Sequence, residues 1–178
     1  MSKKDEGVNV MCDLETLGLR PGCIILSLAA VPFLCDEKIP PFYMKINKSN
    51  YPTSLFHSDP MTEGWWTLQS EAARTEAFSG TAHPSEVLHH FNHWCSQLPG
   101  KVILWGNGSD FDNVILQEAY RLLGLHAPWK YFDNRCYRTL KNLFPQIKFT
   151  KTLFAHNALE DAKAQAVHAE EIFRNQLS

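Results

Sequence analysis

The chain has 178 residues, 44% of them hydrophobic and 20% charged, with a formal net charge of −2 at pH 7. This composition is that of a globular domain with a sizeable core, and it excludes bulk positive charge as the means of attracting nucleic acid. The five cysteines are widely spaced and form no Cys-x-x-Cys pair, which argues against a disulfide framework or a zinc site. The longest apolar run, residues 23–34, is too short to span a bilayer, and the polar start lacks the hydrophobic stretch of a signal peptide. We therefore expect an intracellular protein that does not contact a membrane.

The N-terminal part of the sequence predicts a tail followed by three strands. Residues 1–7 are polar and indicate a flexible tail, and residues 8–178 are expected to form a single domain. Apolar residues alternate over 8–15, which predicts a first strand. The apolar stretch 23–34 predicts a second strand and residues 41–47 a third, both reached through short turns. Three consecutive strands favour an antiparallel meander.

The middle of the chain predicts helices and one further strand. After a polar, proline-bearing loop at residues 49–60, mixed apolar spacings over 61–78 indicate a loop with one or two short helices. Apolar residues that share one face predict a helix over 84–98. Residues 102–105 then predict a short buried strand.

The C-terminal part predicts three helices. Ser109 stands where it could be the N-cap of a helix from Asp110 to Leu123, which Gly124 ends. Residues 135–143 indicate a further helix, and the segment 157–160 resembles a capping box that opens a last, long helix. The order of all these elements predicts a mixed sheet with helices packed on it, in an α/β or α+β domain.

Two carboxylates lie two residues apart at the end of the first predicted strand. Side chains at this spacing point to the same face, so Asp13 and Glu15 project together while Cys12 and Leu14 point to the opposite layer. Like charges this close repel each other unless a cation lies between them, and hard oxygen ligands suit Mg²⁺ or Mn²⁺. The alternative is that both carboxylates simply face water at a strand end.

Three further ionisable residues stand where helices begin. Asp112 lies in the first turn of a helix that follows a strand, although spacing alone leaves Asp110 as an equal candidate and either could serve the helix dipole. Asp161 lies in the first turn of the last helix, and His156 stands just before that helix. The histidine is either a proton acceptor or a capping or core imidazole.

Four carboxylates and a histidine are the groups that two-metal phosphodiester hydrolysis requires. Two divalent ions about 3.5–4 Å apart stabilise the attacking and leaving oxygens in this chemistry. A nearby neutral imidazole can remove a proton from the attacking water.

Three short motifs are spread along nearly the whole chain. They are Asp13-Leu14-Glu15-Thr16, the segment 105–113 with its Gly-Asn-Gly and Phe-Asp, and the segment 156–161. Together they resemble the exonuclease motifs of the DEDDh 3′–5′ exonucleases. The Gly-Asn-Gly and the stretch 65–70 are similar to a bacterial and phage branch of that superfamily, which includes phage exonuclease A-like proteins and a mycobacterial exoribonuclease. The resemblance implies an α/β, ribonuclease H-like fold, with a mixed central β-sheet flanked by α-helices, and a location in the cytoplasm of a bacterium or a phage-infected cell.

The resemblance also implies a role for each ionisable residue. It selects Asp112, in the Phe-Asp pair, rather than the earlier aspartate. Two Mg²⁺ ions are implied, which Mn²⁺ can replace. Asp13, Glu15 and Asp161 would hold one ion, while Asp13 would also reach the second and Asp112 would support it partly through water. His156 would be the general base, because it lies five residues before Asp161 as in the histidine subclass.

Substrate contacts are expected at the ends of the motifs. Thr16 and Leu17 resemble positions that seat the 3′-terminal nucleotide. Asn107 and Phe111 belong to the second motif and are assigned to the substrate, although Asn107 stands one residue further from Asp112 than in the more familiar His-Asn-x-x-Phe-Asp pattern.

Aromatic and basic side chains supply further candidates. Trp65 and Trp66 could stack on a terminal base, although core packing is the better expectation for at least one of them. A basic strip just ahead of His156 is the best candidate for phosphate contacts, with a solvated helix face as the alternative. The strip consists of Arg135, Arg138, Lys141, Lys148 and Lys151.

Other conspicuous residues are expected to be structural. His89, His90 and His93 lie opposite the apolar face of their predicted helix, so a polar surface explains them better than a metal site. The cysteines are expected to be packing residues, since none has an evident cationic setting.

These features predict a metal-dependent 3′–5′ exonuclease that acts on single-stranded ends or 3′ overhangs and releases nucleoside 5′-monophosphates. No residue visibly tests for a 2′-hydroxyl, so the substrate is single-stranded DNA or RNA. A binding module without turnover is the alternative from another class, but it has no need for five ionisable groups around metals. A metal-dependent endonuclease is a further alternative, and the resemblance leaves a homodimer open.

Overall fold

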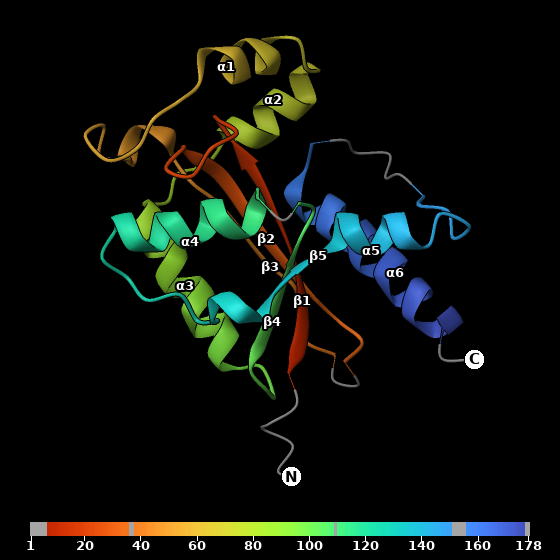
Figure 1. The fold of residues 1–178 in the computed structure, drawn as a ribbon. Coiled ribbons are helices and arrows are strands. Elements are labelled where there is room, and N and C mark those ends of the chain that lie inside the picture. Colours follow the sequence, from red (N-terminus) through yellow and green to blue (C-terminus); the bar gives the residue numbers. More distant parts are fainter. Residues whose placement is uncertain (1–6, 36–37, 109, 151–155, 177–178) are drawn as a thin grey trace.

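The computed structural model describes residues 7–35, 38–108, 110–150 and 156–176. It has a five-stranded sheet in the order β3-β2-β1-β4-β5 with helices on both faces (Figure 1). Most of the predicted N-terminal tail, and Lys151 of the basic strip, lie outside the described residues. In the part of the chain that the structure describes, no helix is both long and apolar enough to cross a membrane.

The strands confirm the predicted meander and add a fifth strand. They are β1 (Val8–Thr16), β2 (Ile25–Phe33), β3 (Phe42–Lys45), β4 (Val102–Gly106) and β5 (Asn134–Cys136). The first three pair antiparallel in sequence order, whereas β4 joins β1 in parallel and β5 joins β4 in parallel. The sheet is therefore mixed, as expected.

Two short helices form where the sequence predicted a loop with one or two of them. The α-helices are α1 (Pro60–Thr67), α2 (Glu71–Phe78), α3 (Pro84–Ser96), α4 (Asp112–Leu122), α5 (Tyr137–Leu143) and α6 (Ala158–Gln176), and short 3-10 turns lie at η2 (Lys48–Asn50) and η3 (Tyr131–Asp133). Figure 1 shows α3 and α4 on one side of the sheet, α5 and α6 on the other, and α1 with α2 beyond its end.

Strand β1 divides its side chains between the two layers. Cys12 and Leu14 enter the larger core, which α3 and α4 complete with residues such as Phe91 and Ile115. Met11 enters a second core beneath α5 and α6. Asp13 and Glu15 have the same parity as Met11 and leave the strand on the α6 side. The two-residue period of the sequence therefore places the acidic pair in the layer that α6 covers.

Two predicted helix starts are corrected. Helix α4 begins at Asp112 rather than Asp110, and its N-cap is Phe111, which makes no side-chain cap bond. The predicted N-cap, Ser109, lies outside the described residues. The helix predicted over 135–143 begins at Tyr137, because the preceding residues pair with β4 as strand β5. A three-residue strand is too short to show a period, so only its pairing reveals it.

Candidate active site

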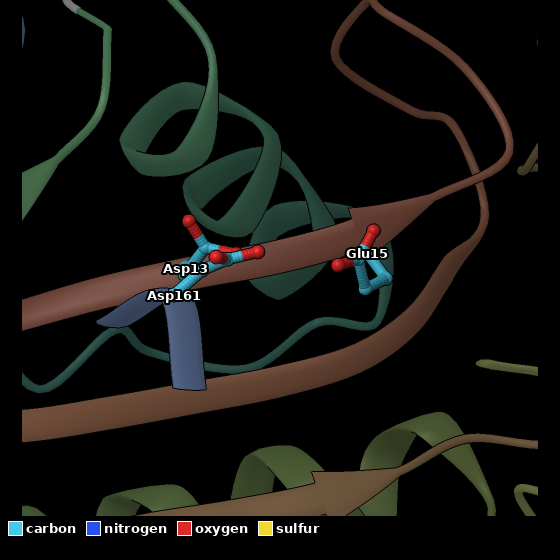
Figure 2. Close-up of side chains that lie close together, drawn as sticks. All are labelled: Asp13, Glu15 and Asp161. Carbon is cyan, nitrogen blue, oxygen red and sulfur yellow. The ribbon is translucent and has the colours of Figure 1, made fainter. Parts of the chain in front are cut away.

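Three carboxylates meet where β1 faces the start of α6. Asp13, Glu15 and Asp161 each offer a carboxylate oxygen, and these oxygens all lie within 4.8 Å of one another. Figure 2 shows the two side chains of β1 beside Asp161, which reaches them from the first turn of α6. The sequence placed these residues on separate elements, and the tertiary structure gathers them at one point.

Small side chains let α6 come close enough for this meeting. Ala29 of β2 packs against Ala158 and Ala162 of α6, and all three are fully buried. Ala29 pairs with Asp13 across the strands, so this contact lies next to the carboxylates. Larger side chains here would move the helix away from the sheet and Asp161 away from Asp13.

Burial and mutual repulsion make the cluster hard to ionise without a cation. Burial raises the pKa of Glu15 to about 8, with help from the charges of Asp161 and Asp112. Burial likewise raises the pKa of Asp13, and the charges of Asp112 and Glu15 add to the effect. A bound cation favours the charged forms, and an all-oxygen donor set suits a hard ion such as Mg²⁺ or Mn²⁺. The residues present therefore fit a divalent metal.

Gln165 touches the cluster and was missed in the sequence. Its side-chain amide donates to Asp13 Oδ1 at 2.8 Å, while its own Oε1 is buried without a partner among the described residues. The signal available in the sequence was spacing, because Gln165 lies four residues after Asp161 on the same face of α6.

Asp112 is fixed beside this cluster by two backbone amides. Its Oδ2 accepts from Asn107 N–H at 2.7 Å, and its Oδ1 accepts from Leu14 N–H at 3.3 Å. Burial raises the pKa of Asp112 to about 6, and these amide bonds oppose the rise. Its bond to Leu14, the neighbour of Asp13 on β1, places Asp112 at the same site, and its charge helps to raise the pKa of Asp13, whereas Asp110 is exposed.

His156 is held in an unusual backbone conformation next to α1. Its φ is 65°, in the left-handed region that few residues other than glycine adopt. Its ring lies 4.8 Å from the ring of Trp65, centroid to centroid, at 89°, and 6.3 Å from that of Trp66. The aromatic residues of α1 thus pack against the predicted base.

A cleft of about 470 Å³ opens beside Glu15. Its lining includes Thr16, Trp65 and Phe111, which the sequence analysis assigned to the substrate. Sequence reasoning missed four lining residues, which are Leu14, Leu19, Met61 and Thr62. Met61 precedes Trp65 by one helical turn of α1, and this spacing was the signal that could have identified it.

Burial or hydrogen bonding restricts three of the expected substrate contacts. Leu17 is 1% exposed, and its backbone N–H and C=O bond Ile24 and Asp59, so it has nothing to offer a nucleotide. Trp66 also lines the cleft but is 2% exposed, and its Nε1–H donates to the carbonyl of Thr16. It is the core member expected of the pair. Asn107 uses its backbone to hold Asp112, and its Oδ1 is buried.

The described members of the basic strip make different contacts. Arg138 is exposed, and its positive charge opposes the rise that burial causes in the pKa of Asp112. Arg135 bonds the carbonyls of Phe132 and Asn134 instead. Lys141 lies over the rings of Tyr137 and Phe149, and Lys148 bonds Pro145. Arg138 is therefore the member of the strip best placed for a phosphate.

The histidines expected on a polar helix surface lie there, and most of the cysteines are buried. His89, His90 and His93 are exposed on α3. All five cysteines are free, and three are buried. Burial raises the pKa of the Cys23 thiol to about 11, which leaves it protonated and unreactive at neutral pH.

Solved exonuclease structures share this fold. Exonuclease I from Methylocaldum szegediense superposes with a TM-score of 0.66 at 16% identity, over 97% of this chain and 42% of its own. E. coli exonuclease I in complex with a dT13 oligonucleotide has a TM-score of 0.58 at 13% identity, over 97% and 41%. The nuclease domain of 3'hExo, a DEDDh family member bound to rAMP, has a TM-score of 0.59 at 13% identity, over 96% and 94%. The chain thus spans about two fifths of the length of the exonuclease I chains.

The chain has the fold of these exonuclease structures, and carboxylates from β1 and α6 meet within it. The chain belongs to the 3'-5' exoribonuclease Rv2179c-like domain family, whose model matches residues 8–173. No curated protein matches its sequence significantly.

Proposed function

We propose that this domain removes nucleotides one at a time from the 3′ end of single-stranded nucleic acid or a 3′ overhang and releases nucleoside 5′-monophosphates. The observation that carries this proposal is the meeting of three carboxylates within 4.8 Å beside an open cleft. Glu15 belongs to the carboxylate cluster and also lines the cleft, so a nucleotide bound in the cleft would bring its phosphate to the carboxylates.

Asp13, Glu15 and Asp161 would hold one divalent ion, and Asp13 with Asp112 would hold a second. When bound, Mg²⁺ or Mn²⁺ supplies positive charge that stabilises the attacking and leaving oxygens of the phosphodiester. The backbone amides that hold Asp112 keep its carboxylate oriented before any ion arrives. Gln165 does the same for Asp13.

His156 is the proposed general base. A ring nitrogen of the neutral imidazole accepts a proton from the attacking water. Trp65, which lines the cleft, packs against this ring and restricts its orientation.

The cleft is the proposed seat of the terminal nucleotide. Trp65 is 41% exposed and Met61 is 84% exposed, so both present apolar surface to a base. Each base stacked on an aromatic ring is worth about 1–3 kcal/mol. Arg138 would contact a phosphate on the Asp112 side.

RNA is the favoured substrate, because the family to which the chain belongs is described as exoribonucleases. The fold alone does not select the sugar, since one structural neighbour carries rAMP and another a DNA oligonucleotide. Matched 5′-labelled RNA and DNA oligonucleotides, each with Mg²⁺, Mn²⁺ or EDTA, test this choice.

We expect a metal-dependent ladder that shortens from the 3′ end, faster on RNA. A faster DNA ladder would reverse the choice of sugar, and cutting of a circular strand would indicate an endonuclease. Failure of every substrate with every metal would favour a binding module.

The two neighbouring aspartates provide a matched test of the site. Asp112→Asn should abolish hydrolysis, because an amide has no charge with which to hold an ion. Asp110→Ala removes an exposed carboxylate two residues away and should leave the rate unchanged. Equal activity of both variants would contradict the assignment of Asp112.

A further inference from the structure

Helix α2 carries a carboxylate that collects three hydrogen bonds near the candidate active site. Glu76 Oε1 accepts from the Tyr43 hydroxyl at 2.8 Å and from Asn157 Nδ2 at 3.2 Å. Its Oε2 accepts from Lys45 Nζ at 3.1 Å. Tyr43 and Lys45 belong to β3, so Glu76 connects the sheet to the residue that follows His156.

Asn157 is held at both ends of its side chain. Its Oδ1 accepts from the backbone N–H groups of Leu159 and Glu160, at 3.0 and 3.1 Å, and so caps α6. Its Nδ2 donates to Glu76. The peptide between His156 and Asn157 is thereby tied to the start of α6 and, through Glu76, to β3.

The conformation of His156 needs such support. A residue other than glycine in the left-handed region costs about 1–3 kcal/mol and persists only where its surroundings hold it. The ring is packed by Trp65 and Trp66 of α1, and the next residue is bonded by Glu76 of α2. The α1–α2 pair therefore holds both the side chain and the backbone of this position.

The charge of Glu76 strengthens the connection. Burial raises the pKa of Glu76, but hydrogen bonds from Tyr43, Lys45 and Asn157 outweigh it, and the pKa lies below its ordinary value. The carboxylate is therefore ionised at neutral pH, and hydrogen bonds to an ionised acceptor are stronger than those between neutral groups.

We propose that Glu76 is a positioning residue for His156, which it holds through Asn157 in the orientation that proton transfer requires. The proposal rests on the proposed function of His156 as general base. Glu76 does not line the cleft and does not belong to the carboxylate cluster.

A double-mutant cycle tests this connection on the full chain. Glu76→Ala should lower kcat about tenfold, because a small misplacement of a catalytic group is costly. KM should change less than twofold, since Glu76 does not line the cleft. In a His156→Ala background, Glu76→Ala should cause no further loss, because the base that it positions is gone.

Two further variants separate positioning from folding. Glu76→Gln keeps an oxygen for Asn157 and should recover part of kcat. Asn157→Asp keeps the cap of α6 but replaces the donor with a carboxylate that repels Glu76, so it should lower kcat with little change in melting temperature. Glu71→Ala removes an exposed carboxylate from the same helix and is the matched control, with unchanged kcat.

The outcomes distinguish the two proposals. If His156→Ala has a low kcat while Glu76→Ala has the wild-type kcat, the positioning role of Glu76 is wrong, and the assignment of His156 as general base is retained. Equal losses from Glu76→Ala with and without His156 would also overturn the positioning role. If His156→Ala itself keeps the wild-type kcat, the general-base assignment is wrong and the role of Glu76 falls with it.

Discussion

At the scale of single residues, Gly106 shows how little space surrounds the carboxylates. It ends β4, and a Cβ added there would overlap Asn113 Oδ1 and lie 2.9 Å from Asp112 Cβ. Asn113 is itself fixed by its Nδ2, which donates to Leu104 O and Asn134 Oδ1. Neither side chain can yield without losing buried hydrogen bonds.

Gly106→Ala should therefore reduce kcat by about 100-fold, because Asp112 must shift to make room. Gly64→Ala is the control, because an added Cβ on this exposed face of α1 has no atom within 4 Å among the described residues outside its own stretch of helix. It should raise stability by about 1 kcal/mol through helix propensity and keep full activity. Steady-state rates and thermal melts of the two variants compare these effects, and wild-type turnover by Gly106→Ala would contradict this account.

At the scale of an element, α1 places two adjacent tryptophans in different environments. Trp65 faces the cleft and His156, whereas Trp66 packs into a small core with Leu17, Leu26 and Ala77. Adjacent residues on a helix point about 100° apart, so one of them must leave the face that the other occupies.

The two tryptophans should respond differently to substitution. Trp66→Ala should lower the free energy of unfolding by about 3–5 kcal/mol, because it leaves a large cavity and removes a buried hydrogen bond. Trp65→Ala should barely change stability but raise KM about tenfold, since it removes a stacking surface worth about 1–3 kcal/mol. Urea titrations and KM measurements separate the two effects. A loss of stability in Trp65→Ala equal to that in Trp66→Ala would refute this division.

Two exposed arginines on different helices are expected to differ in their contact with the substrate. Arg138 lies on α5 near Asp112, whereas Arg121 lies at the far end of α4 and pairs with Glu118. Arg138→Gln should weaken oligonucleotide binding and reduce the slope of log affinity against log salt by about 0.7, the value for one phosphate contact on a single strand. Arg121→Gln should leave the slope unchanged. Equal slopes in both variants would show that Arg138 faces away from the substrate.

At the scale of the whole molecule, the acidic cluster links stability to pH and to metal. Burial raises the folded pKa of Glu15 from its ordinary 4.5 to about 8. Between these values the folded chain binds the proton more tightly than the unfolded chain. This contribution to stability is therefore complete below pH 4.5 and is lost as the pH rises toward 8.

The metal-free protein should therefore melt at a lower temperature at pH 8 than at pH 6, and Glu15→Gln should weaken this dependence. Mg²⁺ should raise the melting temperature more at pH 8, where the carboxylates are ionised and ready to bind. Calorimetry with EDTA and with Mg²⁺ measures both effects. A Mg²⁺ effect that is larger at pH 6 would contradict a site made of these carboxylates. Sedimentation of the same samples tests whether the chain forms the homodimer that the resemblance leaves open.

Local patterns in the sequence predicted most of the fold and placed Asp13, Glu15 and Asp161, whereas the choice of Asp112 over Asp110 came from the resemblance. Alternation along β1 placed Asp13 and Glu15 on one face, and helix-start signals placed Asp161 in the first turn of α6. These features depend on periods and caps within a few neighbouring residues, which a single sequence displays directly.

Contacts between distant segments settled the rest. The alanine contact that brings α6 to β2, the division between Trp65 and Trp66, and the bond from Glu76 to Asn157 join residues on separate elements. Strand β5 likewise exists only through its pairing with β4. No local period records such contacts, because their free energy comes from burial and hydrogen bonds that form only when the whole chain packs. The residue types of the site are thus readable in the chain, whereas their arrangement belongs to the folded molecule.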